Sequence, residues 1–189
     1  MPDLSQAQIG IIACPGGRAF AHLIFGHLEA MTKEKFDDRI RALGQAYNLP
    51  RTEIIRQVNL ASDLQPAAVE GVEPIGEYRS PNWMVPARFT RFPNGEFKTE
   101  LLASVRGSDI YVVQDVSNRW PLEFQKSDEP AVLSVNDHLF CLLVTIDAAL
   151  QAGAARVTVV LPTYPYSRQH KKLSRESLSA ARVGQILET

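Results

Sequence analysis

The chain has 189 residues, of which 45% are apolar and 22% charged, and its formal net charge is −1 at pH 7. This balance is typical of a soluble globular protein, and no apolar run approaches the ~20 residues of a membrane-spanning helix. Two cysteines, Cys14 and Cys141, exclude a disulfide framework and a zinc site. The N-terminus has no basic and apolar leader, so we expect the protein to be cytoplasmic.

The first predicted elements are a strand and two helices. Residues 9–13 form an apolar run that ends at Cys14-Pro15-Gly16-Gly17, the pattern of a buried strand that stops in a turn. We expect one helix over 18–30 and a second helix with Thr32 as its N-cap. The apolar residues that recur at helical spacing, on roughly one face, are Phe20, Leu23, Ile24 and Leu28 in the first helix and Phe36, Ile40, Leu43 and Tyr47 in the second.

Proline and glycine shape the next part of the chain. Leu49-Pro50 should end the second helix, because proline disfavours the helical conformation of the residue before it. A short helix is predicted over 51–60. The stretch 61–87 contains four prolines and two glycines, which indicates an irregular connection.

The second half of the sequence is more regular. A hairpin is predicted from strands over 88–92 and 97–101, joined by Pro93-Asn94-Gly95. Residues 109–114 are rich in β-branched and aromatic side chains and predict a buried strand. A polar loop then occupies 117–133.

A helix is predicted over 137–152, with Ser134 and Asp137 forming a relative of the capping box and Gly153 ending it. Its expected core residues are Leu139, Leu142, Leu143, Ile146 and Leu150, with Cys141 among them. Residues 155–161 read as a parallel strand covered on both faces, followed by a basic loop over 162–177 and a helix over 178–188. The alternation predicts an α/β fold with a mainly parallel sheet flanked by helices.

Positive charge is concentrated near the C-terminus. The segment 168–182 carries five basic side chains against Glu176, a net of +4 in a chain of −1. The basic loop follows a parallel strand, and ligands of open α/β sheets bind at the carboxyl ends of strands. Arginine forks and lysines there suit phosphate oxygens, and the alternative is a solvated loop without a ligand.

Two other segments carry candidate chemistry. In the turn Phe92-Pro93-Asn94-Gly95-Glu96, an aromatic ring can stack on a base while the amide and carboxylate read an exocyclic amine. The alternative is a hairpin that uses Asn-Gly for its backbone angles, with Phe92 in the core. Asn136-Asp137 is interpreted first as a helix cap, and His138 as a satisfied or solvent-facing histidine rather than a metal ligand.

The order and spacing of five segments resemble the N-terminal domain of ribose-phosphate pyrophosphokinase, the family that makes phosphoribosyl pyrophosphate. They are the turn 92–96 (FPNGE), 104–114 (SVRGSDIYVVQ), 136–139 (NDHL), 156–162 (RVTVVLP) and 166–172 (YSRQHKK). The resemblance runs from about Arg88 to the end of the chain. Residues 9–30 fit the first strand and helix of the family loosely.

The resemblance implies transfer of the diphosphoryl group of ATP to ribose 5-phosphate for nucleotide biosynthesis, with release of AMP. It implies ATP and ribose 5-phosphate as ligands, Mg²⁺ as cofactor, and self-association into dimers or hexamers. Neither nucleic acid nor a membrane is an expected partner. The implied fold is that of a phosphoribosyltransferase-like N-terminal domain.

The resemblance also implies roles for individual residues. Adenine would be held by Phe92, Asn94 and Glu96, usually for ATP bound to a neighbouring subunit. Arg168 and Gln169 would contact ATP. A mobile catalytic loop that covers the phosphates would carry Lys171, Lys172 and Arg175. No metal ligand is assigned to this chain, because magnesium bridges phosphate oxygens and keeps much of its water.

Some positions depart from the family pattern. His170 stands where the family usually has Asp, which changes the electrostatics of the loop. The loop 168–175 is one residue shorter than usual. Residues 31–87 are a helical or irregular insertion relative to the compact form of the family.

The chain ends inside a predicted helix, before the next strand of the family, its metal-binding histidine and its second domain. We therefore expect residues 1–189 to be one partial N-terminal domain, incomplete at its C-terminus and inactive on its own. One alternative is a non-catalytic regulatory paralogue that binds nucleotide or assembles with active subunits. Another is a stand-alone nucleotide-binding protein. A phosphoribosyltransferase is not expected, because its acidic phosphoribosyl-binding motif is missing from the sequence.

Overall fold

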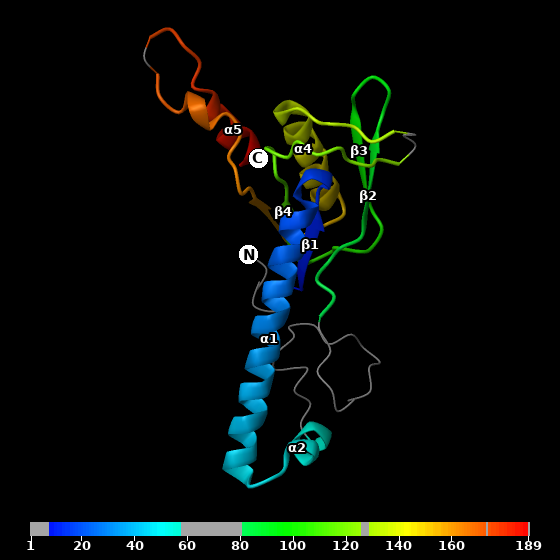
Figure 1. Cartoon of the computed structure of the whole chain (residues 1–189), viewed down its shortest axis with the longest axis vertical. Coiled ribbons are helices and arrows are strands. Elements are labelled where there is room, and N and C mark those ends of the chain that lie inside the picture. The colour runs from blue at the N-terminus through cyan, green and yellow to red at the C-terminus, as the bar shows by residue number, and fades with distance from the viewer. Residues whose placement is uncertain (1–7, 58–80, 126–128, 173, 189) are drawn as a thin grey trace.

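A three-stranded parallel sheet forms the centre of the molecule. The computed structural model describes residues 8–57, 81–125, 129–172 and 174–188. Its elements are β1 (Ile9–Ala13), the 3-10 turn η2 (Pro15–Gly17), α1 (Arg18–Tyr47), α2 (Arg51–Gln57), β2 (Ala87–Arg91), β3 (Phe97–Leu101), β4 (Asp109–Val113), α4 (Val135–Gln151), β5 (Arg156–Val160), the 3-10 turn η3 (Ser167–Gln169) and α5 (Ser179–Leu187). The strand order of the sheet is β1–β4–β5, and β2 with β3 forms a separate antiparallel hairpin (Figure 1). The predicted α/β architecture with a parallel core is confirmed.

The two faces of the sheet are covered by different helices, because successive side chains of a strand point to opposite faces. Ile11 and Val113 pack with the first turns of α1, together with Phe20, Ile24 and Leu28. The other face carries the main core, to which β1, β4, α4 and the hairpin all contribute. Its members include Ile12, Phe89, Ile110, Val112, Leu139 and Leu142. Burial of these apolar surfaces is the main force that holds the sheet, helices and hairpin together.

The strands are in register, so that their carboxyl ends meet at one edge of the sheet. Ala13 lies opposite Val113, and Val113 lies opposite Val160. In the described part of the chain β5 pairs with β4 alone; Arg156 is exposed and the other four residues of the strand are half-buried. The prediction of a strand covered on both faces is therefore wrong in degree, because β5 lies at the edge of this sheet.

Helix α1 is a single helix of 30 residues, and the prediction of two helices is wrong. Thr32, the expected N-cap, lies inside it and donates its hydroxyl proton to the carbonyl of Leu28 at 2.7 Å, a bond that threonines make in the middle of helices. The residues before it, Glu29, Ala30 and Met31, include good helix formers, so nothing interrupts the helix. It ends where predicted, with Asn48 in the left-handed conformation.

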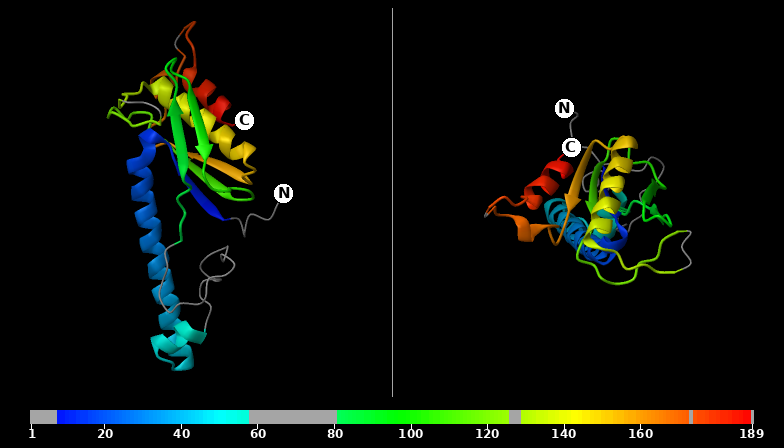
Figure 2. Two further views of the ribbon diagram at one scale, coloured as in Figure 1. Left: turned by 90° about the vertical axis from the view of Figure 1, so that its right-hand side faces the viewer. Right: turned by 90° about the horizontal axis from the view of Figure 1, so that it is seen from above.

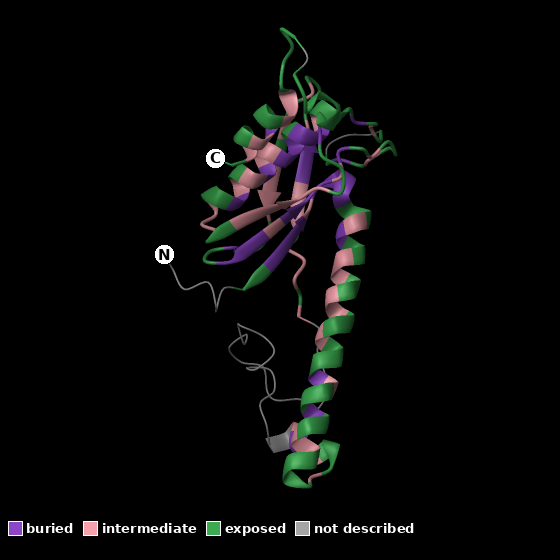
Figure 3. Cartoon of the chain, turned by 90° about the vertical axis from the view of Figure 1, so that its left-hand side faces the viewer, coloured by how far each residue is buried: buried purple, intermediate pink, exposed green. Residues whose placement is uncertain are grey.

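Only part of α1 touches the sheet. The rest projects from the α/β body and meets α2 at its far end (Figures 1 and 2). Buried Phe36 and Ile40 pack there with Leu43 and Ile55, in a small cluster of their own. Most of the surface between the two contact regions is exposed (Figure 3).

Three residues of the predicted apolar helix faces are exposed, including Leu150, which we predicted to be buried. Leu23 is 72% exposed because the side of α1 toward the sheet carries Ala21 with Phe20, Ile24 and Leu28. Tyr47 is 69% exposed at the last residue of α1, far from the sheet (Figure 1). Leu150 is 46% exposed in the last turn of α4, where its neighbour Ala149 takes the buried position toward the core. The apolar faces of α1 and α4 lie where predicted, but each face includes fewer residues than the sequence pattern indicates.

The remaining expectations are confirmed where the structure describes the chain. The short helix is present over Arg51–Gln57, and residues 81–86 are irregular. Part of that segment runs beside β1, with the amide of Ile11 bonded to the carbonyl of Trp83 at 2.7 Å. The prediction for 61–80 falls outside the described residues.

Candidate functional site

The loops that follow β1, β4 and β5 leave the same edge of the sheet. The amide of Cys14 donates to the carbonyl of Val113 at 2.9 Å, and the amide of Gln114 donates to that of Val160 at 3.1 Å. The parallel pairing thus continues to the last residue before each loop. Such an edge is where open α/β sheets bind their ligands.

The loop after β1 is pressed against the start of α4. A Cβ atom on Gly16 would lie 2.6 Å from Cε1 of His138 and 2.8 Å from the carbonyl oxygen of Asp115. One on Gly17 would lie 2.5 Å from the carbonyl oxygen of Val113. Both glycines are needed for this close approach, since any side chain would collide with backbone atoms.

His138 is fully buried beneath this loop. Its Nε2 lies 3.1 Å from the carbonyl oxygen of Asn118, so the neutral ring carries its proton on Nε2. Burial lowers the pKa of His138, and the carbonyl of Asn118 with the carboxylates of Asp115 and Asp137 opposes this only in part. The expectation of a satisfied or solvent-facing ring is half right, because Nδ1 has no hydrogen-bond partner among the described residues.

The N-terminus of α4 is closed by a full capping box. The hydroxyl of Ser134 accepts from the amide of Asp137 at 3.2 Å, and a carboxylate oxygen of Asp137 accepts from the amide of Ser134 at 2.9 Å. Burial raises the pKa of Asp137, but the hydrogen bonds from Ser134 and the charge of Arg91 outweigh it, and the pKa is lowered. The cap interpretation is confirmed for Asp137, whereas Asn136 lies in the first turn of the helix and takes no part in the cap.

The turn between β2 and β3 presents the predicted adenine-binding side chains to solvent. The amide of Phe92 donates to the carbonyl of Glu96 at 2.8 Å, and the amide of Glu96 donates to Oδ1 of Asn94 at 3.2 Å. Gly95 has a φ of 92°, which glycine supplies without strain. Phe92 is 40% exposed, so its ring is not a core residue.

The basic loop begins at η3 and returns at the start of α5. Its predicted ligand-binding side chains, Arg168, Gln169, Lys171, Lys172 and Arg175, are all exposed. The loop is closed at its neck, where the hydroxyl of Ser177 donates to Oε1 of Gln169 at 3.3 Å. Within the described residues none of its four cations has an ion-pair partner, so the loop carries uncompensated positive charge.

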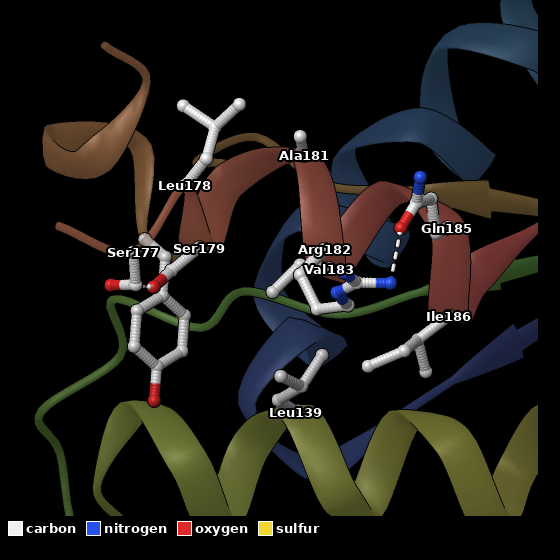
Figure 4. A pocket seen from close by; sticks show the side chains of 10 residues that line it. Leu139, Ser177, Leu178, Ser179, Ala181, Arg182, Val183, Gln185 and Ile186 are labelled. Carbon is white, nitrogen blue, oxygen red and sulfur yellow. Dashed lines mark hydrogen bonds between the residues drawn. The ribbon is translucent and has the colours of Figure 1, made fainter. Parts of the chain in front are cut away.

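A groove of about 570 Å³ lies between the neck of this loop, α5 and α4. Leu139 of α4 faces Val183 and Ile186 of α5 across it, and the side chain of Arg182 is bonded to that of Gln185 at 2.7 Å (Figure 4). Its lining is largely apolar. The groove therefore does not suit phosphate groups, which the basic loop beside it does.

The structure does not bring the two sets of predicted ATP-binding residues together. The turn of the hairpin and the basic loop lie on opposite sides of α4, both from the side and from above (Figures 1 and 2). One chain therefore presents the two predicted sets of residues on separate parts of its surface.

Sequence reasoning missed one residue pair at the start of the basic loop. The hydroxyl of Tyr166 donates a hydrogen bond to Oδ1 of Asn136 in the first turn of α4. The two residues are 30 positions apart, and both stand in segments that we had singled out. No local pattern could have paired them.

Comparison with known proteins identifies the family. A family model described as the N-terminal domain of ribose phosphate pyrophosphokinase matches residues 80–189, which is more than half of the chain. The chain belongs to this family. The match extends from before β2 to the end of the chain, so every residue of the pyrophosphokinase site predicted above lies inside it.

Individual pyrophosphokinases give the same result. The chain is 37% identical over 100 residues to the ribose-phosphate pyrophosphokinase of Staphylococcus saprophyticus, a match that covers 52% of this chain and 26% of that protein. It is 36% identical over 101 residues to the ribose-phosphate pyrophosphokinase of Bacillus caldolyticus, which covers 53% and 27%. The match thus spans about a quarter of the length of these curated relatives.

A solved structure shows the same fold. The crystal structure of phosphoribosylpyrophosphate synthetase from Mycobacterium smegmatis matches with a TM-score of 0.53 and 21% identity, over 96% of this chain and 39% of that one. At this identity the likeness concerns the fold alone. None of the described helices, α1 included, combines the length and the apolar character of a membrane-spanning segment.

Proposed function

We propose that this chain is the nucleotide-binding part of a ribose-phosphate pyrophosphokinase, which transfers the diphosphoryl group of ATP to ribose 5-phosphate for nucleotide biosynthesis. The observation that carries the proposal is the loop after β5. It places four cations, without ion-pair partners in the described part of the chain, beyond the carboxyl end of a parallel strand. Such a cluster favours a multiply charged anion, and a triphosphate satisfies it.

The reaction needs positioned charge rather than a covalent intermediate. The C1 hydroxyl oxygen of the sugar bonds to the β-phosphorus of ATP, the bond from that phosphorus to the α,β-bridging oxygen breaks, and AMP leaves with the electron pair. The hydroxyl proton passes to solvent. Negative charge on the phosphoryl oxygens is stabilised by fixed cations, a role that we assign to Lys171, Lys172 and Arg175. Arg168 and Gln169 would bind ATP at the neck of the loop.

The hairpin turn would hold the adenine of ATP bound to another copy of the chain. The exposed ring of Phe92 is available for stacking, and Asn94 and Glu96 lie beside it in the same tight turn. The separation of the turn from the basic loop across α4 supports a site shared between copies. Self-association into dimers or hexamers is therefore part of the proposal.

Magnesium would enter with the nucleotide. The described residues contain no group of three or more His, Cys, Asp or Glu side chains that could hold a metal ion. Magnesium binds phosphate oxygens and retains several waters, so Mg–ATP is the substrate that we propose. We assign no step to a metal held by this chain.

We propose that residues 1–189 are one partial N-terminal domain, with 31–87 inserted relative to the compact form of the family. The family match begins at residue 80, near the proposed end of the insertion. We also propose a cytoplasmic location, which the two free thiols, Cys14 and Cys141, favour because thiols persist in a reducing compartment.

A second candidate function is that of a non-catalytic subunit that binds nucleotide or assembles with active subunits. His170 favours it, since an imidazole replaces the carboxylate expected at that place of the catalytic loop. Its Nδ1 lies 2.9 Å from the carbonyl oxygen of Ser167, so the ring is turned back onto η3. This candidate predicts binding of ATP without release of AMP.

The first experiment is calorimetric titration of the chain with Mg–ATP. We expect binding, and we expect Lys171→Ala/Lys172→Ala to weaken it about tenfold or more, because each lysine loses a charged contact with phosphate. Lys33→Ala/Lys35→Ala on the exposed side of α1 removes the same charge elsewhere and should leave the affinity unchanged. Equal losses in both variants, or no heat at millimolar ATP, would contradict the proposal.

The second experiment measures release of AMP from ATP with ribose 5-phosphate, using the protein as isolated from its source. Turnover that depends on Lys171 and Lys172 supports the transferase. If the same preparation binds ATP but releases no AMP, the proposed transferase activity is contradicted and the non-catalytic subunit takes its place as the proposed function.

A further inference from the structure

The backbone of Tyr166 is unusual. Its φ is 58° and its ψ 17°, and it is one of two residues other than glycine with positive φ in the described part of the chain. The other is Asn48, at the end of α1, where asparagine is common. A bulky aromatic residue rarely adopts this conformation, and it persists only where the surroundings hold it in place.

Three hydrogen bonds hold this stretch of the chain. Tyr166 donates its hydroxyl proton to Oδ1 of Asn136, and its own carbonyl accepts from the amide of Gln169 at 2.9 Å, which closes η3. Two residues earlier, the hydroxyl of Tyr164 donates to the carbonyl of Ala180 at 3.0 Å. The neck of the basic loop is therefore tied to α4 by one tyrosine and to α5 by the other.

The tie to α4 reaches a rigid point. Asn136 lies in the first helical turn, which the capping box of Ser134 and Asp137 fixes. The main core holds Leu139, one turn further along the same helix, against the sheet. A bond to Asn136 therefore fixes the neck of the loop relative to the whole α/β body.

We infer that Tyr166 is a positioning residue, whose hydrogen bond to Asn136 sets the place of Arg168 and Gln169 at the neck of the basic loop. The inference rests on the proposed function, in which these two side chains bind ATP. The bond fixes only the neck, and the excursion that carries Lys171, Lys172 and Arg175 lies beyond it. Without this bond, Tyr166 can leave its unfavourable backbone conformation. The residue that directly precedes η3 is then no longer held in place.

The test compares Tyr166→Phe with Tyr164→Phe in the full 189-residue chain. Each variant removes one hydroxyl and keeps the ring, but only the first breaks the tie to α4. We expect amide exchange of Gln169 to become about tenfold faster in Tyr166→Phe, and Mg–ATP affinity to fall about five- to tenfold, as for the loss of one hydrogen bond. Tyr164→Phe should leave the affinity within twofold.

Variants of Asn136 separate positioning from general stability. Asn136→Ala should reproduce Tyr166→Phe, and the double variant should be no worse than either single variant, because both break the same bond. Asn136→Asp keeps an acceptor oxygen and should restore slow exchange of the Gln169 amide. Additive effects of the two single variants, or equal effects of the two tyrosine variants, would overturn the inference.

Failure of the proposed function would look different. A wild-type chain that binds no Mg–ATP contradicts the assigned ligand, whereas the exchange measurements, which need no nucleotide, still decide whether Tyr166 fixes η3. Unchanged exchange in Tyr166→Phe with weaker ATP binding would also reject the positioning role, since the hydroxyl would then act on ATP directly.

Discussion

Arg156 forms a two-pronged ion pair with Asp109 across neighbouring parallel strands. Its Nε donates to Oδ1 of Asp109 at 2.9 Å, its Nη2 donates to Oδ2, and the hydroxyl of Tyr111 adds a third bond at 3.3 Å. The two residues are the first of β4 and β5 and lie directly opposite each other. The pair therefore fixes the register of the two strands at the edge remote from the basic loop.

This pair should make the protein sensitive to acid. The hydrogen bonds and charge of Arg156 lower the pKa of Asp109 against the opposing effect of burial. The unfolded chain then binds the proton more readily, so the stabilisation is present above about pH 4 to 5 and is lost as pH falls through the lower pKa of the folded state. We expect Asp109→Asn to cost about 1 kcal/mol at pH 7, because Arg156 is half exposed and screened, and less near pH 2.

Urea unfolding at the two pH values measures this difference. Asp38→Asn is the matched control, since Asp38 pairs with Arg41 on the exposed side of α1 and should contribute little at either pH. Equal losses for the two variants at pH 7 would show that the strand pair adds nothing to stability.

His138 should produce a second pH dependence, nearer neutrality. Because burial lowers its pKa, the unfolded chain binds a proton at His138 from about pH 6.5 downwards, whereas the folded chain does not until its own lower pKa. Stability should thus fall with acidification through this window, by at most about 1.4 kcal/mol per pH unit. His138→Gln keeps a donor for Asn118 and should flatten the slope between pH 7 and 5.

Gly16 and Gly26 should respond oppositely to alanine. At Gly16 the new Cβ would collide with the ring of His138 and a backbone carbonyl, so we expect Gly16→Ala to destabilise the fold by about 1–3 kcal/mol. Gly26 lies within α1 with nothing within 4 Å of its would-be Cβ, so Gly26→Ala should stabilise by about 0.5–1 kcal/mol. Thermal unfolding of the two variants gives the comparison, and a stable Gly16→Ala protein would refute the close packing of the loop after β1 against α4.

Phe92 should matter for the ligand and not for the fold. We expect Phe92→Ala to change the free energy of unfolding by less than about 1 kcal/mol, since the ring is exposed. It should lower the Mg–ATP affinity of the self-associated protein about fivefold or more through lost stacking. Phe89→Ala, in the same strand region but 4% exposed, should instead cost about 3–5 kcal/mol. An unchanged Mg–ATP affinity in Phe92→Ala would show that the hairpin turn is not part of the proposed ATP site.

Local patterns predicted the parts of the fold that local interactions decide. Asn94-Gly95 marks the hairpin because its turn needs a positive φ at glycine, and Ser134 with Asp137 marks the start of α4 because both partners of the cap lie within one turn. The predicted N-cap at Thr32 is wrong, because the capping preference of a residue carries no information about the helix formers on both sides of it.

Tertiary contacts decided the rest. Leu23 and Leu150 have the spacing of buried residues, but whether a neighbouring element reaches them depends on how far the sheet and hairpin extend. The features of the candidate site also fall into those that the sequence predicts and those that only the folded chain shows. Its basic loop and its aromatic turn are visible in the sequence, whereas the bond from Tyr166 to Asn136 and the placement of the turn and the loop across α4 require the folded chain.

The length of α1 has a mechanical consequence. From Leu28, the last residue of the helix that packs with the sheet, to Tyr47 the axis rises about 28 Å at 1.5 Å per residue. Any molecule that docks at the α2 end is thus held a fixed span away from the sheet by a single continuous rod. A force applied at α2 acts on β1 through the whole length of this helix. A small tilt of α1 at Phe20 and Ile24 therefore produces a large displacement of α2.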